Sequence, residues 1–524
     1  MIVSSQNISL IQIVSKIFKS LSSRKKKQLV FLSFLILISS FCEILILSSI
    51  QPFLFALEQS NKNLIIESNG FFSNIFFNSQ QNLKTLLFIF IFLLIISASL
   101  RLTIIYWNNY FAASLGNELG SSAYSNSLSQ PYSYHLKTNT SNIVSNIVTK
   151  TSSLTDTIRY LMSFISSLFI FMAIFLSLLK INFSITLIIS FSFISFYGIL
   201  ILFINKRINK ISKIKSKLIN QQTQSLQEGL GFIRDIILDK CQKTFENEFK
   251  SKDRKLRLID AKSNFLEASP KYLLEVIGIS ILIITSLIYS RNNPIEIIPI
   301  LGTFAFGIQR LLPPLQQIYG SYVFIETHKY SSFSVLNMLE NQGSLDLNNN
   351  NNKYRKKFKN QISFKSVYFQ YAKDSKYVLK DFDLQIKKGE KIGLIGKSGA
   401  GKSTILDLIM GLTKPDKGEI LVDGKNMHDK SFKIEGWYSQ ISHVPQNIFL
   451  SDQSLAENIA FGIDKKNINM KKIKEAIKIS QLNKLVEESE KGLFTKVGER
   501  GMQISGGQRQ RIGIARAIYK GGKI

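Results

Sequence analysis

The chain has 524 residues, a formal net charge of +30 at pH 7 and two cysteines, Cys42 and Cys241. This length accommodates two or three domains. A basic balance is typical of either a nucleic-acid binder or a membrane protein, and here most lysines and arginines flank apolar stretches, so we expect no nucleic-acid partner. One cysteine lies in an apolar run and the other in a charged segment, which argues against a disulfide framework or a metal site.

Six apolar stretches are long enough to cross a membrane as helices, since about 20 residues span ~30 Å of hydrocarbon. They are residues 29–57, 84–108, 159–180, 183–205, 271–290 and 296–320. Only a few residues around Lys180, Ile181 and Asn182 separate the third stretch from the fourth. We therefore predict a tight helical hairpin there.

Basic residues predict the orientation of these spans. The cluster Arg24–Lys27 precedes the first span, and a series of lysines and arginines from Lys206 to Arg257 follows the fourth. The positive-inside rule then places the N-terminus and the segments 109–158 and 206–270 in the cytosol. We predict a multi-pass protein of the cytoplasmic membrane whose helices continue beyond the membrane into the cytosol.

Three charged residues, Glu43, Arg101 and Arg310, interrupt the apolar stretches. Such residues are costly in hydrocarbon and favour a role in the substrate path or a buried partner; the alternative is that they only shape the helix bundle. At ~1.5 Å per residue, Glu43 is expected nearer the outer side and Arg101 nearer the inner side, so we do not expect them to pair. Arg310 precedes Pro313 and Pro314, which predict a kinked sixth helix.

The domain boundaries follow from composition. We predict an N-terminal segment at 1–28, a helical membrane domain at 29–340, an Asn/Lys-rich linker at 341–361 and a soluble α/β domain at 362–524. ISFKSVYFQY, from Ile362, alternates like a strand, KIGLIG reads as a short strand that ends in Gly396, and a helical pattern follows from Lys402.

GKSGAGKST, residues 396–404, matches G-x-x-x-x-G-K-[ST] between a predicted strand and a predicted helix. In this pattern the backbone wraps around phosphates, Lys402 reaches the β- and γ-phosphates and Ser403 ligates Mg²⁺. We expect a nucleoside triphosphate to be held by Gly396, Ser398, Gly399, Ala400, Gly401, Lys402, Ser403 and Thr404.

Two further motifs make the pattern specific: Gln446 in SHVPQNIFL, and Ser505-Gly506-Gly507-Gln508 about a hundred residues after the glycine-rich loop. Together these residues resemble an ABC transporter of the exporter type, and the resemblance covers essentially the whole chain. It implies an all-α six-helix transmembrane domain followed by an α/β P-loop nucleotide-binding domain, with ATP and Mg²⁺ as cofactors.

The resemblance also implies roles for single residues. Tyr371 stacks on adenine, and Gln446 approaches Mg²⁺ and the attacking water as the catalytic Q-loop residue. Residues 505–508 form the signature motif, with Ile504 in place of the usual leucine, and 495–501 resembles the loop that precedes it. The signature of one subunit closes over the ATP of the other, which implies a homodimer or a pair of half-transporters. Residues 130–145 and 226–242 occupy the positions of coupling helices.

In this family a strand ending in Asp-Glu, and then a switch histidine, follow the stretch that corresponds to ARAIYKGGKI. We therefore expect the sequence to be a fragment, truncated before the Walker B aspartate and the catalytic glutamate. ATP hydrolysis is not expected from the 524 residues alone.

The implied function is an ATP-driven exporter or flippase. Residues 268–279, the sequence GIQRLLPP and the surroundings of Glu43 resemble transporters of lipid-linked oligosaccharides and permeases associated with polysaccharides. We therefore expect contact with membrane lipids and an amphipathic substrate. Two alternatives stay open: a peptide or drug/lipid exporter, and a non-hydrolysing nucleotide-binding membrane protein whose short C-terminus is genuine.

Overall fold

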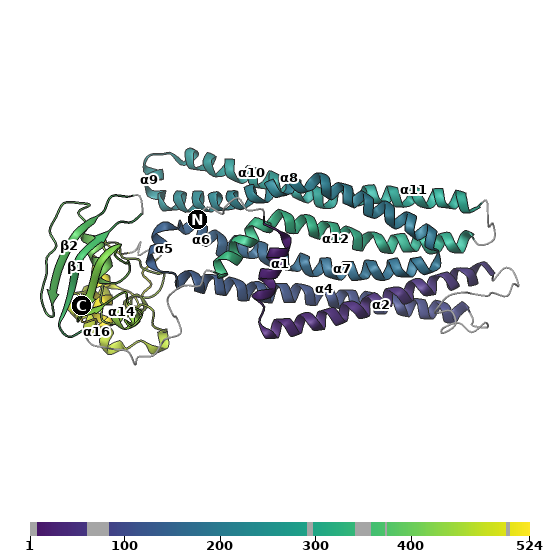
Figure 1. Cartoon of the computed structure of the whole chain (residues 1–524). Coiled ribbons are helices and arrows are strands. Elements are labelled where there is room, and N and C mark those ends of the chain that lie inside the picture. Colours follow the sequence, from purple (N-terminus) through teal and green to yellow (C-terminus); the bar gives the residue numbers. More distant parts are fainter. Residues whose placement is uncertain (1–7, 60–82, 291–296, 341–357, 373–374, 499–503) are drawn as a thin grey trace. The chain divides into compact units, whose positions relative to one another are not determined.

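The structure of the chain is a computed structural model that describes residues 8–59, 83–290, 297–340, 358–372, 375–498 and 504–524 (Figure 1). It divides into two compact units, one of residues 1–130 and 135–345 and the other of residues 131–134 and 346–524. Residues 341–357 of the predicted linker lie outside the described residues.

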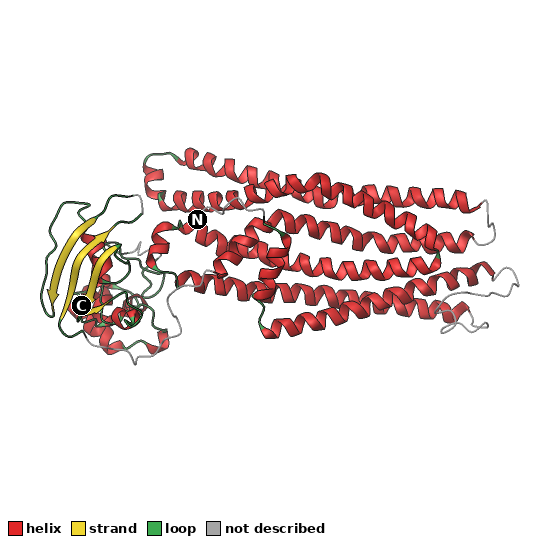
Figure 2. Ribbon diagram, viewed as in Figure 1, coloured by secondary structure: helices red, strands yellow, loops and turns green. Residues whose placement is uncertain are grey.

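The described residues of the first unit are helices and short connections, as Figure 2 shows. The elements are α1 (Leu10–Lys19), α2 (Ser23–Gln59), α4 (Leu83–Leu128), α5 (Tyr132–Lys137), α6 (Thr140–Ser145), a π-helix (Asn146–Lys150), α7 (Thr151–Ile181), α8 (Phe183–Gly231), α9 (Ile233–Leu238), α10 (Gln242–Ala268), α11 (Pro270–Ser290) and α12 (Ile297–Glu340). Because a helix satisfies its own backbone hydrogen bonds, this is the architecture that a hydrocarbon environment requires.

Four helical segments among the described residues are long and apolar enough to cross a membrane: Ser23–Ile50, Leu87–Leu128, Thr140–Ile181 and Phe183–Gly231. They contain the first four predicted spans, except for residues beyond Ile50 and before Leu87. The fifth and sixth predicted spans fall on α11 and α12, and residues 291–296 between these helices lie outside the described part. The 49 residues of α8 extend about 74 Å, so α8 continues far beyond ~30 Å of hydrocarbon, as predicted.

The predicted hairpin is present, because α7 ends at Ile181 and α8 begins at Phe183. Asn182 alone joins the two helices. Its backbone is extended, and its side-chain Oδ1 accepts a hydrogen bond from the backbone N–H of Ile185 at 3.1 Å. This is an N-cap, which satisfies a donor that the first turn of α8 leaves unpaired.

Short helices lie where the coupling helices were expected: α5 and α6 within 130–145, and α9 within 226–242. α1 was not predicted from the sequence. Its N-cap Ser9 forms a capping box with Gln12, and Ile13 and Ile17 are buried. The Nζ atom of Lys16 donates to Asn337 and Glu340 near the end of α12, at 2.6 Å in each case. The N-terminal segment is therefore attached to the last turns of α12.

α12 is the central helix of the unit and packs against α7, α8, α2 and α11. One core contains Ile174, Leu178, Phe193 and Phe304, each nearly inaccessible to solvent. At Gly307 an added Cβ would lie 2.7 Å from a methyl group of Leu178, so α7 and α12 approach closely there. α12 continues through Pro313 and Pro314 as one helix, although neither proline can donate a backbone hydrogen bond.

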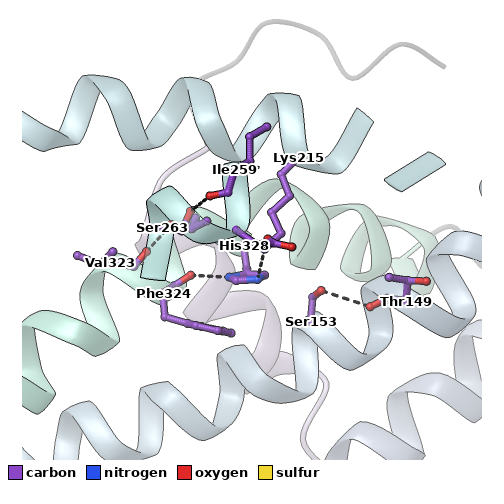
Figure 3. Close-up of polar contacts among 10 residues, drawn as sticks. Thr149, Ser153, Lys215, Ile259, Ser263, Val323, Phe324 and His328 are labelled. Atoms are coloured by element: carbon purple, nitrogen blue, oxygen red, sulfur yellow. Dashed lines mark hydrogen bonds and ion pairs between the residues drawn. The ribbon is translucent and has the colours of Figure 1, made fainter. Parts of the chain in front are cut away.

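Beyond the predicted spans, α8, α10 and α12 are joined by a polar network, part of which Figure 3 shows. The Nζ atom of Lys215 lies 2.7 Å from Oδ1 of Asp260 and 2.8 Å from Nε2 of His328. Nδ1 of His328 lies 2.9 Å from the Phe324 carbonyl oxygen. Because an ammonium only donates and a carbonyl only accepts, this network assigns a neutral imidazole with its proton on Nδ1.

The second unit contains the strands (Figure 2). Its elements are β1 (Gln361–Phe369), β2 (Leu379–Lys387), α13 (Lys402–Ile409), β3 (Lys417–Val422), β4 (Lys425–Asn426), α14 (Ile434–Tyr438), α15 (Leu455–Ile459), α16 (Met470–Ile479), α17 (Asn483–Glu488) and α18 (Gly506–Lys520), with short 3₁₀ turns at Lys465–Asn467 and Gly492–Phe494. The strands form one antiparallel sheet in the order β2-β1-β3-β4.

β1 is the strand predicted from ISFKSVYFQY. Its buried side chains change phase between Phe364 and Val367, because a bulge with Ser366 at φ 45° separates them. Opposite the bulge, Gly418 has φ +81°, and an added Cβ would lie 2.5 Å from the Lys365 carbonyl oxygen. Only glycine fits at that position. The bulge keeps both halves of β1 facing the core beneath α13.

Candidate functional site

The glycine-rich loop at 396–404 precedes α13 and leaves the helix N-terminus open. Gly399 and Gly401 have φ of +82° and +86°, values that glycine adopts without steric cost. Gly401 is the N-cap of α13, and no side chain caps the helix. The first N–H groups of α13 are therefore directed at the loop and available to an anion.

Lys402 and Ser403 begin α13 beside this loop. The Nζ atom of Lys402 donates to the carbonyl oxygens of Gly396 and Lys397, at 2.7 and 2.8 Å, so the ammonium lies within the loop. Ser403 is exposed on the first turn. An ammonium inside a turn of N–H groups, next to an accessible hydroxyl, fits a polyphosphate with its magnesium ion.

Tyr371 follows β1 and is brought to the same helix. Its hydroxyl lies 2.8 Å from Oγ1 of Thr404, and its ring packs edge-on against Phe369 at 5.0 Å. The ring is 42% exposed, which leaves a surface for a planar base. The structure thus brings Tyr371 and Thr404, two residues predicted to bind the nucleotide, into contact.

Gln446 is exposed in the irregular segment between α14 and α15. Ser442 anchors the start of this segment: its N–H donates to the Ile524 carbonyl oxygen at 2.8 Å, and its hydroxyl donates to that of Ala517 at 2.9 Å. Burial raises the pKa of the Asp407 carboxyl in α13, and the electrostatic effect of His443 opposes this rise. His443 is therefore close enough to α13 to affect the Asp407 carboxyl.

The predicted signature forms the start of α18. Ser505 is the N-cap and makes a capping box with Gln508: Ser505 Oγ accepts from the Gln508 N–H at 3.2 Å, and Gln508 Oε1 accepts from the Ser505 N–H at 2.9 Å. Among the described residues, no atom outside the adjoining residues and the helix's own backbone lies within 4 Å of a Cβ built on Gly506 or Gly507. Beyond the capping box, the described residues therefore leave space beside this end of α18. Residues 499–501 of the predicted preceding loop lie outside the described residues.

One expectation about this unit is wrong. KIGLIG, residues 391–396, was predicted to be a strand, but the structure assigns it no strand, and the Ile395 side chain is 99% exposed. A strand exists only when neighbours receive its hydrogen bonds, and within the described residues no strand lies beside this stretch. The apolar pattern was correct for a buried strand, but a pattern does not supply the neighbours.

A second expectation is also wrong: Glu43 and Arg101 do pair. Arg101 Nη2 lies 2.8 Å from Glu43 Oε1, and Arg310 Nη1 lies 3.5 Å from Glu43 Oε2. The depth estimate assumed that the apolar limits of the two helices lie at the same level. It also neglected the length of an arginine side chain, which reaches over about one helical turn.

Ser97 completes this charged cluster and was not predicted. Its hydroxyl donates to Glu43 Oε1 at 2.5 Å, and it lies one helical turn before Arg101 on the same face of α4. The signal was present in the sequence, because Ser97 and Arg101 have i, i+4 spacing within one apolar run. The cluster joins α2, α4 and α12.

The cluster carries one more positive than negative charge. Glu43 is fully buried, whereas Arg101 and Arg310 are 31% and 20% exposed. The Arg101 Nε atom is buried and has no hydrogen-bond partner among the described residues. The guanidinium of Arg310 also lies 5.2 Å from the centre of the Phe306 ring. The arrangement leaves hydrogen-bonding capacity for an anion.

Comparison with known families matches residues 379–524 to the model described as ABC transporter, and residues 29–288 to the model described as ABC transporter transmembrane region. Among solved structures, the chain resembles a bacterial Atm1-family ABC exporter with ATP bound. The TM-score is 0.74 and the identity 17%, and the match covers 95% of this chain and 84% of that one.

Curated relatives agree with these matches. The chain is 36% identical over 218 residues to the heterocyst differentiation ATP-binding protein HepA of Nostoc sp. (strain PCC 7120), which covers 42% of this chain and 35% of that protein. It is 32% identical over 331 residues to the ATP-dependent lipid A-core flippase of Legionella pneumophila (strain Paris), which covers 62% of this chain and 55% of that protein. The chain spans about half the length of the flippases it matches.

Replacement of Glu43 by glutamine is expected to destabilise the helical unit. The substitution leaves two guanidiniums without their counter-charge, and loss of one partner of a buried pair costs about 3–5 kcal/mol. Thermal unfolding of the purified protein in detergent measures the effect. Ser97→Ala, which removes only a hydroxyl, is expected to shift the midpoint much less. An unchanged midpoint for Glu43→Gln would show that the cluster does not hold the helices together.

Proposed function

Because the chain belongs to the ABC transporter family and carries a transmembrane region and an ATP-binding domain in one polypeptide, we propose that it is one subunit of an ATP-driven exporter or flippase. The protein is a multi-pass membrane protein. The observation that carries the proposal is the open N-terminus of α13 with Lys402 inside its glycine-rich loop. From the basic segments and the positive-inside rule we propose that the N-terminus and the ATP-binding domain lie in the cytosol and that the membrane is the cytoplasmic one.

We propose that the described residues bind ATP in the following way. Lys402 exchanges its two carbonyl acceptors for the β- and γ-phosphate oxygens, and the first N–H groups of α13 donate to the same phosphates. Tyr371 supplies a ring face for adenine, and Ser403 and Gln446 are the residues that we propose would hold Mg²⁺. When bound, Mg²⁺ neutralises charge on the phosphates. We propose that the assembled dimer hydrolyses ATP and that Gln446 contacts the attacking water.

The signature motif supports a dimer. α18 begins with Ser505 and two glycines that leave room around the helix N-terminus, and its N–H groups form a second anion-binding surface. We propose that this surface of one subunit closes over the ATP held by the loop of a second, identical subunit. ATP then shifts the population toward the closed dimer, because only that state makes both sets of contacts.

The charged cluster supports an amphipathic anionic substrate. Arg101 and Arg310 share a single carboxylate, and the Arg101 Nε atom is buried without an acceptor. A phosphate or pyrophosphate group fits such a site, since guanidinium groups bind these anions in bidentate fashion. Several relatives are named lipid A-core flippases. We propose a lipid-linked oligosaccharide, or a lipid of similar chemistry, as the substrate.

Lys402→Ala is expected to weaken ATP binding by about 10- to 100-fold, because a hydrogen bond to a charged group contributes about 1.5–3 kcal/mol. Titration of the purified chain with a fluorescent ATP analogue measures the affinity. Lys397→Ala is the matched control, because Lys397 contributes a carbonyl oxygen rather than its ammonium to the loop. Equal affinities for Lys402→Ala and the unmodified chain would contradict the site.

Cysteines at Ser398 and Ser505 are expected to form a disulfide between two subunits when Mg-ATP is present. The closed dimer brings the glycine-rich loop of one subunit to the signature of the other, and the native Cys42 and Cys241 are replaced beforehand. Non-reducing electrophoresis detects the cross-linked dimer. The control pair combines Ser398→Cys with Ser366→Cys, which lies in the bulge of β1. This pair is expected to give no cross-linked dimer. Absence of ATP-dependent cross-linking would contradict the dimer.

Arg310→Gln is expected to raise the concentration of lipid-linked substrate needed for half-maximal stimulation of ATPase activity by about tenfold, with basal activity little changed, since one charged hydrogen bond is worth about that factor. The assay uses the intact transporter in liposomes. Arg159→Gln is the control, because Arg159 makes a surface ion pair with Asp156. Equal loss of basal and stimulated activity would remove Arg310 from the substrate path.

A further inference from the structure

A pocket of about 240 Å³ lies between α2 and α4, away from the charged cluster. It is lined by Lys27, Gln28, Phe31, Leu32, Trp107, Tyr110 and Phe111. Lys27 and Glu43 are separated by about 24 Å along α2, at ~1.5 Å per residue. The pocket is therefore a separate site, and it does not depend on the proposed function.

The pocket has an apolar floor and an aromatic wall. Leu32 and Phe111 are each 2% exposed and form the floor. The Trp107 ring packs edge-on against Phe31 and Tyr110, with ring centres 5.8 Å apart in both pairs. Phe31 and Tyr110 are about half exposed. The wall presents apolar surface on its outer side.

The rim of the pocket is polar, and one of its hydrogen-bond acceptors has no partner among the described residues. The Oε1 atom of Gln28 is buried and has no hydrogen-bond partner among the described residues. Such an orphaned acceptor costs free energy unless a donor reaches it. Lys27 is exposed and, in the part of the chain that the structure describes, makes no ion pair. By contrast, the neighbouring Lys25 is buried and is bound to Glu118 at 3.6 Å and to the Ser114 hydroxyl.

The position of the pocket identifies the kind of ligand. Lys27 directly precedes the first predicted span, and Trp107 ends the second, so both lie at the cytosolic boundary of the membrane. Tryptophan and tyrosine side chains concentrate at this level, and cationic side chains there attract anionic lipid. The volume is below the ~300–1,000 Å³ of pockets that enclose a drug-sized ligand. It suits a headgroup and the first part of an acyl chain, with the remainder in the bilayer.

We propose that this pocket binds one anionic glycerophospholipid of the cytosolic leaflet, with a headgroup that carries hydroxyl donors, as in phosphatidylglycerol. The Lys27 ammonium pairs with the phosphate, and a headgroup hydroxyl donates to Gln28 Oε1. The acyl chain lies along Phe31 and Tyr110. Phosphatidylcholine lacks the donor for Gln28 and carries a cation beside Lys27. The bound lipid joins the cytosolic ends of the first two spans.

Trp107 reports on its own pocket, since the chain has only two tryptophans. The other, Trp437, is 4% exposed within the second unit and donates to the Ile409 carbonyl oxygen at 2.9 Å. The full chain is reconstituted in phosphatidylcholine vesicles with either phosphatidylglycerol or phosphatidylcholine brominated near the carboxyl end of the acyl chain. Bromine quenches only a nearby tryptophan. Measurements on the unmodified chain and on Trp437→Phe guard against misfolding of that variant.

Brominated phosphatidylglycerol is expected to quench Trp107 at least threefold more effectively than brominated phosphatidylcholine at equal mole fraction, with or without ATP. Lys27→Ala and Gln28→Ala are each expected to lower the ratio of quenching by phosphatidylglycerol to quenching by phosphatidylcholine toward one. Lys26→Ala removes the same charge from the neighbouring position, outside the pocket, and is expected to retain the preference.

Three results would overturn the proposal. Equal quenching by the two lipids would show that the pocket does not select a headgroup. Equal effects of Lys26→Ala and Lys27→Ala would show that the preference for anionic lipid comes from diffuse surface charge and not from the pocket. Absence of quenching by either lipid would mean that another chain, such as a second copy, covers Trp107.

Discussion

The ion pairs of Glu43 with Arg101 and Arg310 are the constraint on which the arrangement of the helical unit depends. Glu43 is fully buried among apolar helices, and both arginines approach it; isolated charges are strongly disfavoured in such an environment. The three residues come from α2, α4 and α12, which are separated by long stretches of sequence. Their pairing therefore selects one arrangement of these helices, whereas apolar contacts alone would tolerate several.

Polar contacts also join helices outside the predicted spans. Lys215, Asp260 and His328 join α8, α10 and α12 through one donor and two acceptors, and Lys16 joins α1 to the end of α12. Such contacts supply partners to polar groups that pack between helices. The Oε1 atom of Gln28 and the Nε atom of Arg101 are among the buried polar atoms that have no hydrogen-bond partner within the described residues. They lie at the proposed lipid pocket and at the proposed anion site.

In the ATP-binding domain, the N-termini of two helices provide N–H groups that can bind phosphate. α13 begins after a glycine with φ +86° and has no side-chain cap, so its N–H groups stay available. α18 begins with a capping box, yet its first two residues are glycines with open space around them. Both ends present positive potential to phosphate. A nucleotide between two such ends would be bound from both sides, which gives a physical reason for two subunits.

The amino-acid sequence determined the features that depend on local chemistry. Apolar runs of about 20 residues fixed the first four spans, Asn182 fixed the hairpin, and the order of glycines, Lys402 and Ser403 fixed the loop and the start of α13. These features follow from contacts within a few residues along the chain. The same short range explains why α1 escaped notice: its buried face becomes visible only against α12.

Tertiary structure alone decided which distant groups meet. Depth along two separate helices gave the wrong answer for Glu43 and Arg101, because the sequence does not state how far one helix slides past another or how far a side chain reaches. KIGLIG had the composition of a strand, but a strand needs neighbours, and its composition does not provide them. The bulge at Ser366 likewise depends on Gly418 in another strand. Pairing across the fold is a property of three-dimensional packing, whereas hydropathy and helix capping are properties of the chain itself.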